Sequence, residues 1–269
     1  MLFSVLISCY KKDKPEELAI ALRSIWDEQT VKPAEIVIVK DGPLTPELDV
    51  VIEEFFNRAP VKVVPLKENR GLGLALAEGV THCSYDYIAR MDSDDISVSD
   101  RFEKQVSFLE KHPEVAICGG MIQEFSGTPD NITGKRLLPQ KNTEIFNFLK
   151  KRNPFNHMTV MYKKQAVLDA GNYQHILGYE DYWLWARVLA AGEQGENLSD
   201  ILVYVRAGDN MLQRRRGYAF FKAEIDMALK LKQISILNWL EVVRNIMLRG
   251  GIRLLPTWVL RMVYCKLRG

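Results

Sequence analysis

The sequence is poor in cysteine and has no long uncharged apolar run. Its four cysteines (Cys9, Cys83, Cys118 and Cys265) are scattered without a Cys-x-x-Cys pair, so we expect neither a disulfide scaffold nor a zinc site, but small buried thiols in a reducing compartment. No window reaches the ~18 uncharged apolar residues of a transmembrane helix. The N-terminus also lacks the basic residues and the cleavage site of a signal peptide. The sequence thus predicts a cytoplasmic protein.

The composition is that of an ordinary globular protein, with 47% hydrophobic and 26% charged residues in a chain of 269, enough to bury one large core. The charge is unevenly distributed along the chain. Residues 214–269 carry 12 Lys and Arg against 3 Asp and Glu, whereas residues 1–213 carry 24 against 31. This asymmetry predicts an acidic body and a basic tail that meets something anionic.

The first hundred residues alternate between apolar strands and amphipathic helices. We predict strands at 2–9, 35–42, 61–66 and 86–91, separated by helices at 15–29, 46–59 and 71–83. Strands that are apolar throughout and alternate with helices are typical of right-handed βαβ units. The fold class is therefore predicted to be α/β, with a Rossmann-like, doubly wound, mostly parallel sheet covered by helices on both faces.

The second half has a less regular pattern and no Pro- or Ser-rich linker before it. Predicted helices lie at 99–114, ending before Pro113, and at 143–151, 164–171 and 181–192; predicted strands lie at 115–125, 157–162 and 200–206. The strand at 115–125 is expected to bend at its two glycines, and 126–134 is rich in turn residues. We expect the two halves to pack as one unit.

Four polar clusters of the first half are expected to share one rim, because ligands of such sheets bind beyond the carboxyl ends of the strands. They are residues 8–10, 41–42, 68–71 and 92–95. In the last cluster, Asp92 and Asp94 are two residues apart and point the same way in an extended segment. Carboxylates of this kind hold Mg²⁺ or Mn²⁺ together with substrate phosphate oxygens. The alternative is that the aspartates cap the helix that starts near Ser99.

Several motifs, taken in order, resemble one enzyme family. SVLISCY, VIVKDGP, ENRGLGLALAEG and ARMDSDD resemble the nucleotide-sugar half of the family 2 glycosyltransferases, which have the GT-A fold. Residues 178–188, GYEDYWLWARV, resemble the Glu-Asp motif of the acceptor side, and 153–164 resemble a segment of bacterial polysaccharide members. The resemblance covers roughly residues 1–210 and points to amylovoran-type and O-antigen hexosyltransferases. It implies a GT-A domain at 1–213, with a nucleotide-sugar half (1–97) and an acceptor-binding half (98–213).

On the donor side, the resemblance implies that a nucleotide sugar is bound by Ser8, Tyr10, Asp41, Arg70, Arg90, Asp92 and Ser93. Asp41 matches the aspartate that hydrogen-bonds uracil, although a tight turn also explains Asp41-Gly42-Pro43. The metal, Mn²⁺ or Mg²⁺, is expected on Asp92, Asp94 and Asp95. Arg90 is predicted to contact either these aspartates or the diphosphate. Lys40 and Pro43 depart from the family pattern, so the nucleotide contacts stay open.

On the acceptor side, the resemblance implies that Asp181 is the general base and that Glu180 orients the acceptor or the loop. An acidic pair at the start of a helix is also explained by the helix dipole. His157, Trp183 and Arg214 are candidate contacts to the acceptor or the diphosphate. His157 has a structural alternative as a buried side chain at the start of a strand, and the basic run from Arg214 has an alternative contact with lipid headgroups.

The tail, 214–269, combines helical periodicity with basic and aromatic residues, most clearly at 252–268. Basic amphipathic helices of this composition lie in membrane interfaces that contain anionic lipids. The alternative is a basic helical pair packed on the body. We therefore expect a peripheral protein at the inner face of the cytoplasmic membrane, with no nucleic acid partner.

The predicted function is that of an inverting, metal-dependent glycosyltransferase. It would move a hexose, galactose or glucose, from a UDP-sugar to a saccharide linked to undecaprenyl diphosphate during O-antigen, capsule or exopolysaccharide synthesis. One alternative is a nucleotidyltransferase, although residues 8–12 lack the glycines of a phosphate loop. The other is a non-catalytic membrane-associated partner with the same fold.

Overall fold

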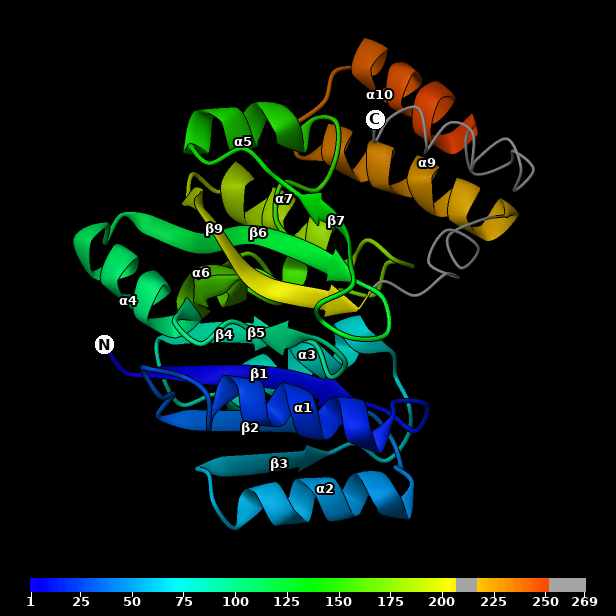
Figure 1. The fold of residues 1–269 in the computed structure, drawn as a ribbon. Helices are drawn as coiled ribbons and strands as arrows, with labels where there is room; N and C mark the ends of the chain where they lie inside the picture. The colour runs from blue at the N-terminus through cyan, green and yellow to red at the C-terminus, as the bar shows by residue number, and fades with distance from the viewer. Residues whose placement is uncertain (207–216, 252–269) are drawn as a thin grey trace.

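The computed structural model describes residues 1–206 and 217–251, which form a nine-stranded sheet covered by helices (Figure 1). The strand order is β3-β2-β1-β4-β8-β6-β9-β5, and β7 pairs with β6. The strands are β1 (Phe3–Cys9), β2 (Glu35–Lys40), β3 (Val61–Pro65), β4 (Tyr87–Met91), β5 (Ile96–Ser97), β6 (Val115–Phe125), β7 (Ile132–Arg136), β8 (Met161–Lys163) and β9 (Gln194–Arg206).

The helices begin where the sequence provides start signals. Proline occupies the first turn of both α1 and α2, and α10 begins with a capping box between Asn238 and Glu241. The α-helices are α1 (Pro15–Ile25), α2 (Pro46–Phe56), α3 (Leu72–His82), α4 (Arg101–Lys111), α5 (Asn142–Leu149), α6 (Lys164–Asp169), α7 (Glu180–Ala190), α9 (Tyr218–Gln233) and α10 (Trp239–Asn245).

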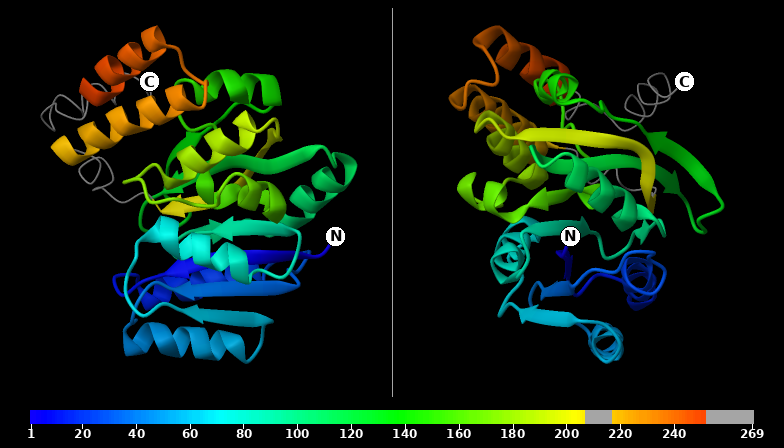
Figure 2. Two further views of the ribbon diagram at one scale, coloured as in Figure 1. Left: turned by 180° about the vertical axis from the view of Figure 1, so that it is seen from behind. Right: turned by 90° about the vertical axis from the view of Figure 1, so that its left-hand side faces the viewer.

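The first half confirms the predicted doubly wound arrangement. Strands β1 to β4 are parallel, and two hydrophobic cores lie on opposite faces of the sheet. Val5 and Ile7 of β1 belong to the core under α1, α2 and α4, whereas Leu6 belongs to the core under α3 and α7 (Figure 2). Because successive residues point to opposite faces, a strand buried on both faces must be apolar throughout.

The second half departs from the predicted elements in three places. Residues 157–162 are not one strand, because a 3-10 helix (His157–Thr159) precedes the short β8. Strand β9 begins at Gln194 rather than at 200, since parallel pairing with β6 extends it into a polar segment. Strand β7 begins within the stretch predicted to be rich in turns and pairs with β6. The predicted bend of β6 is present as a register shift against β9 at Gly119–Met121.

The C-terminal helices α9 and α10 lie against the second half, beside α5 and α7, and α10 continues into a π-helical turn (Ile246–Gly250) (Figure 1). Among the described residues, no helix has the length and apolarity needed to cross a bilayer. The cysteines at 9, 83 and 118 are free and buried. Arg214 and the predicted membrane segment 252–268 lie outside the described residues.

Candidate active site

The carboxyl ends of β1, β2 and β4 meet at one rim of the sheet. Cys9 pairs with Lys40 and Ile7 pairs with Met91, so the segments that follow these strands are neighbours. Ser8 is the penultimate residue of β1, and Tyr10 follows the strand as an exposed side chain. The rim therefore joins residues 10–13, 41–42, 69–71 and 92–95.

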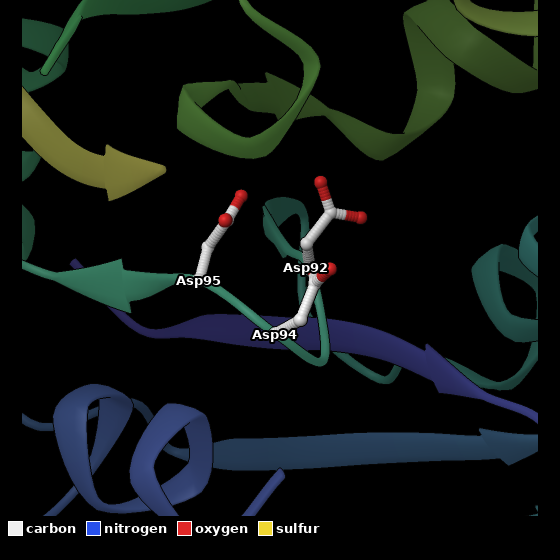
Figure 3. Close-up of side chains that lie close together, drawn as sticks. All are labelled: Asp92, Asp94 and Asp95. Carbon is white, nitrogen blue, oxygen red and sulfur yellow. The ribbon is translucent and has the colours of Figure 1, made fainter. Parts of the chain in front are cut away.

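Three carboxylates crowd the loop after β4. Asp92, Asp94 and Asp95 each place an oxygen within 4.8 Å of the others (Figure 3). The Asp94 side chain is open to solvent on one side but shielded by protein on the other. That desolvation, with the charges of Asp92 and of Asp13, raises the pKa of Asp94 to about 6. Burial and the charges of Asp92 and Asp94 raise the pKa of Asp95 well above its usual range. The loop therefore disfavours its own negative charge.

Asp13, in the loop after β1, adds a fourth carboxylate that the sequence did not reveal. Its Oδ2 accepts hydrogen bonds from the Ser93 hydroxyl at 2.8 Å and from the Tyr10 N–H at 3.1 Å. Burial and the charge of Asp92 raise the pKa of Asp13, although both hydrogen bonds oppose the increase. Ser93 thus turns toward Asp13 and fastens the acidic loop to the segment that follows β1.

Arg90, at the end of β4, is buried and forms an ion pair with Asp92. Desolvation by burial lowers the pKa of Arg90, but the charge and hydrogen bond of Asp92 together with the charges of Tyr173 and Asp95 raise it more, so the pKa lies above its usual value. Arg90 Nε and Nη1 have no hydrogen-bond partner within the described part of the chain. The fully buried Arg101 donates from Nη2 to the Arg90 carbonyl at 2.8 Å. Of the two contacts predicted for Arg90, the structure shows the one with Asp92, and it adds Arg101 as a support of the Arg90 backbone.

Arg206, the last residue of β9, ties the acidic loop to the second half. Its N–H donates to Asp95 Oδ1 at 2.9 Å, and its Nε donates to the Asp94 carbonyl at 3.2 Å. The same Nε lies 3.2 Å from a Glu17 carboxylate oxygen, and the guanidinium lies over the Phe125 ring. No local pattern marks Arg206, because it reaches the loop through sheet pairing between β5 and β9.

Asp41, after β2, is buried and its carboxylate holds the loop at 69–71. It accepts hydrogen bonds from the Arg70 N–H at 2.7 Å, the Gly71 N–H at 3.0 Å and Asn69 Nδ2 at 2.9 Å. A Cβ at Gly42, which has φ of +83°, would lie 2.6 Å from the Asn69 nitrogen. The predicted tight turn is thus present. The Arg70 guanidinium is partly exposed and lies 3.8 Å from Glu78.

Glu180 and Asp181 open α7, beside the start of α3. Asp181 Oδ2 accepts from Asn153 Nδ2 at 2.6 Å and its Oδ1 accepts from the Tyr182 N–H at 2.7 Å. A Cβ on Gly73 would lie 3.1 Å from the Cβ of Glu180, so α7 begins against the helix that follows the 69–71 loop. The acidic pair is therefore close to the rim.

The buried Tyr173 is affected electrostatically by Arg90 and by the acidic pair at the start of α7. Burial raises its pKa, the charge of Arg90 lowers it, and the charges of Asp181 and Glu180 raise it. The pKa of this one side chain thus depends both on Arg90, which contacts the acidic loop, and on the Glu-Asp pair. The carboxylates after β4 and those of α7 therefore belong to one electrostatic neighbourhood.

His157 and Trp183 are buried rather than open to a ligand. His157 Nε2 lies 2.9 Å from the Tyr173 hydroxyl, and burial together with the charge of Arg90 holds the pKa of His157 well below its usual range. Trp183 Nε1 donates to Gln174 Oε1 at 2.9 Å, and its ring lies under Arg187 and Lys230. Their positions favour a structural role for both.

Known proteins resemble this chain in sequence and in fold. Residues 4–177 match the family described as Glycosyl transferase family 2. The amylovoran biosynthesis glycosyltransferase AmsE of Erwinia amylovora is 42% identical, covering 98% of both chains. The UDP-Gal:alpha-D-GlcNAc-diphosphoundecaprenol beta-1,3-galactosyltransferase of Escherichia coli is 36% identical, covering 98% of this chain and 95% of that one.

The crystal structure of S. aureus TarS 1–349 in complex with UDP-GlcNAc superposes with a TM-score of 0.67 at 18% identity, covering 86% of this chain and 66% of that one. That likeness establishes a GT-A-like fold. The sequence matches also establish the family, since the two relatives match over nearly the whole chain. The chain belongs to family 2 of the glycosyltransferases, and it is an enzyme of that class.

Proposed function

We propose that this family 2 glycosyltransferase moves a hexose, with inversion, from a UDP-sugar to a saccharide carried on a lipid diphosphate. The observation that carries the proposal is the group of three aspartates whose oxygens lie within 4.8 Å of one another at the sheet rim. Carboxylates in such a group suit a hard divalent cation, and a cation there suits a sugar diphosphate. The nearby Asp181 supplies the second requirement, a base for the acceptor.

Asp92 and Asp94, with Asp95 beside them, would hold Mn²⁺ or Mg²⁺. The raised pKa values of Asp94 and Asp95 support this assignment, because burial and the charges of neighbouring aspartates make the ionised forms unfavourable and a bound cation would offset both effects. When bound, the metal supplies positive charge for the departing diphosphate. Arg90 holds Asp92 in place, and Arg206 holds the backbone of the loop.

Asp181 would take the proton of the acceptor hydroxyl while that oxygen attacks the anomeric carbon from the face opposite the diphosphate. The bond between the anomeric carbon and the diphosphate oxygen breaks, and UDP leaves with the electron pair. Asn153 and the Tyr182 N–H fix the orientation of the Asp181 carboxylate. Glu180 would position the acceptor. The donor pocket would use Asp41 for the uracil, with Ser8, Tyr10, Arg70 and Ser93 around the nucleotide sugar.

Galactose or glucose is the proposed hexose, and N-acetylhexosamine on undecaprenyl diphosphate is the proposed acceptor. The names of the relatives from Erwinia and Escherichia support this choice, since one belongs to amylovoran synthesis and the other specifies UDP-galactose and a lipid-linked GlcNAc. Among the two sugars we favour galactose, in β linkage, as part of bacterial surface polysaccharide assembly.

The test is to incubate purified protein with Mn²⁺, a GlcNAc-diphospholipid acceptor and a panel of nucleotide sugars, and to measure release of the nucleoside diphosphate. We expect UDP release with UDP-galactose or UDP-glucose, and none when a chelator removes the metal. Release from GDP- or dTDP-sugars alone contradicts the donor assignment, and unchanged release with chelator contradicts the metal.

The helix α10 and its π-helical turn supply a candidate surface for the membrane that would carry this acceptor. Five exposed apolar side chains lie on this segment, among them Leu240 at 83% exposed: Trp239, Leu240, Val243, Met247 and Leu248. Residues 214–269 carry 12 basic against 3 acidic residues. An apolar face on a basic segment fits an anionic bilayer, which takes up the apolar side chains and attracts the cations.

Vesicle flotation tests this membrane contact. We expect the full chain to float with vesicles containing phosphatidylglycerol but not with pure phosphatidylcholine, and we expect Leu240→Glu with Met247→Glu to lower the bound fraction about fivefold or more. Val50→Glu is the control, since Val50 is 52% exposed on α2. Equal flotation of the double variant contradicts the proposed face.

A further inference from the structure

Arg249 lies in the π-helical turn after α10. Two separate chains of contacts, made of hydrogen bonds, an ion pair and a ring contact, link it to the surroundings of Asp181. We propose that Arg249 is a positioning residue, which holds the Asp181 carboxylate in the orientation needed for transfer. The inference rests on the proposed role of Asp181 as the base. It gives the C-terminal helices a function in the reaction besides any contact with a membrane.

The first chain runs through the C-terminal end of α5. The last carbonyls of a helix have no partner within the helix; here donors from other elements bind the carbonyls at the end of α5 and the Lys151 carbonyl just beyond it. The Tyr182 hydroxyl donates to the Leu149 carbonyl, Asn245 Nδ2 donates to the Lys150 carbonyl at 2.8 Å, and Arg249 Nη1 donates to the Lys151 carbonyl at 2.7 Å. Arg249 thereby fixes the chain at its exit from α5.

The segment that follows α5 contains the residue that donates a hydrogen bond to Asp181. Asn153 is two residues after Lys151, and its Nδ2 donates to Asp181 Oδ2 at 2.6 Å. Asn153 is itself held, since its Oδ1 accepts from the Phe155 N–H at 3.2 Å. A shift of the backbone at Lys151 is therefore transmitted to the amide that orients the base.

The second chain of contacts runs through an ion pair whose acidic partner is buried. Arg249 Nε lies 2.8 Å from Glu224 Oε1, and Glu224 is only 3% exposed. The Tyr179 hydroxyl donates to Glu224 Oε2, and the Arg249 guanidinium lies over the Tyr182 ring. Tyr179 and Tyr182 flank Glu180-Asp181 in the sequence. Arg249 thus acts on the residues at both ends of the acidic pair.

A stability role alone does not explain this arrangement. Apolar contacts of equal volume attach two helices at least as well as a buried ion pair, whose desolvation opposes its Coulombic attraction. A buried ion pair does define one register of one element against another. The register defined here is that of α7 and the α5 exit, the two segments that hold Asp181. π-Helical turns of this kind occur frequently at functional sites.

The test compares Arg249→Met with Arg244→Met in the full-length protein. Methionine keeps the length and the apolar contacts of the arginine. Arg244 is the matched control, because it donates to the neighbouring Lys150 carbonyl at 3.5 Å but has no contact with Glu224. We expect Arg249→Met to lower kcat about tenfold while the KM for the UDP-sugar changes less than about twofold, since donor binding is untouched. Arg244→Met should stay close to the wild type in both.

A second readout keeps the inference separate from the proposed reaction. Hydrogen exchange of the backbone around 152–156 and 179–183 should become faster in Arg249→Met and stay unchanged in Arg244→Met. Tyr179→Phe removes one hydroxyl from the second chain and should lower kcat about threefold, even if Arg249→Met fails to fold.

Wild-type kcat in Arg249→Met, or unchanged exchange in both segments, overturns the inference. If Arg249→Met does not fold, wild-type kcat in Tyr179→Phe overturns it. A wild-type protein that transfers no sugar, with faster exchange in Arg249→Met, contradicts the proposed function but leaves the positioning contacts in place.

Discussion

The aspartates at the ends of β2 and β4 occupy equivalent places on the rim but are surrounded in opposite ways. Asp41, after β2, is buried and accepts hydrogen bonds from Asn69 and from two backbone N–H groups. Asp94, after β4, is open to solvent on one side and lies beside Asp92 and Asp95. The first carboxylate accepts hydrogen bonds from donors of the protein, whereas the second lies beside other carboxylates of the same charge.

This difference separates a side chain that maintains the rim, whatever contact it also makes with uracil, from one whose charge is left for a cation to neutralise. A buried carboxylate with three donors stabilises the loop that supplies them. A crowded carboxylate lowers the stability of the folded chain until a cation or proton neutralises it. The position of an aspartate after a parallel strand therefore does not define its role, and the contacts around it do.

Replacing Asp94 should have the largest effect on activity. Asp94→Asn keeps the volume of the side chain but removes one charged ligand of the proposed metal, so we expect transfer to fall by about 100-fold or more at moderate Mn²⁺. The free energy of unfolding should stay the same or rise. Asp86→Asn, at the opposite end of β4, is the control with an exposed aspartate. Unchanged transfer by Asp94→Asn at saturating Mn²⁺ contradicts the metal assignment.

Replacing Asp41 should lower the stability of the protein, in contrast to replacing Asp94. Asp41→Ala leaves the partly buried N–H groups of Arg70 and Gly71 without their acceptor, and we expect it to lower the free energy of unfolding by about 2 kcal/mol. Urea denaturation measures the loss. Asp41→Asn keeps one acceptor oxygen and should lose less. If Asp41→Ala is as stable as the wild type, its carboxylate does not maintain the loop.

A change of one pH unit should have the smallest effect of the three, and it tests Asp94 separately from Asp41. The pKa of Asp94 is raised to about 6, so the folded protein holds this proton more tightly than the unfolded chain. The charged loop therefore loses stability as pH rises from about 4 to about 6. A cation binds the ionised form, so its affinity should increase up to about tenfold per pH unit over that range and level off above.

Calorimetric titration of Mn²⁺ at several pH values checks this expectation. In Asp94→Asn the part of the pH dependence that comes from this carboxyl should disappear. An affinity in the wild type that is the same below and above the pKa of Asp94 contradicts the idea that the crowded carboxylates bind the ion.

The elements of the first half could be predicted because their periodicity is local. An apolar run such as β1 and an amphipathic segment such as α1 carry their own signals. Strand β9 could be predicted only in part, since its polar first residues become extended through pairing with β6. The 3-10 helix at His157 interrupts an apolar run whose composition favours a strand.

The residues that support the candidate site could not be predicted from the sequence, for a related reason. The motif of Asp92 and Asp94 is contiguous, but Asp13, Arg101 and Arg206 reach its surroundings only through the folded sheet. Asp13 comes after a strand and Arg206 ends one, and such a position is only a weak indication of a site residue. For Arg101, a fully buried cation in α4, the amphipathic pattern predicts an exposed charge instead.

The anomeric configuration of the transferred sugar tests the account most directly. Proton NMR of the product formed from UDP-galactose and a GlcNAc-diphospholipid reports that configuration. The donor is α-linked, so direct attack by an acceptor activated by Asp181 predicts a β-linked galactose, and Asp181→Asn should form little of it. An α-linked product, or full transfer by Asp181→Asn, contradicts the account.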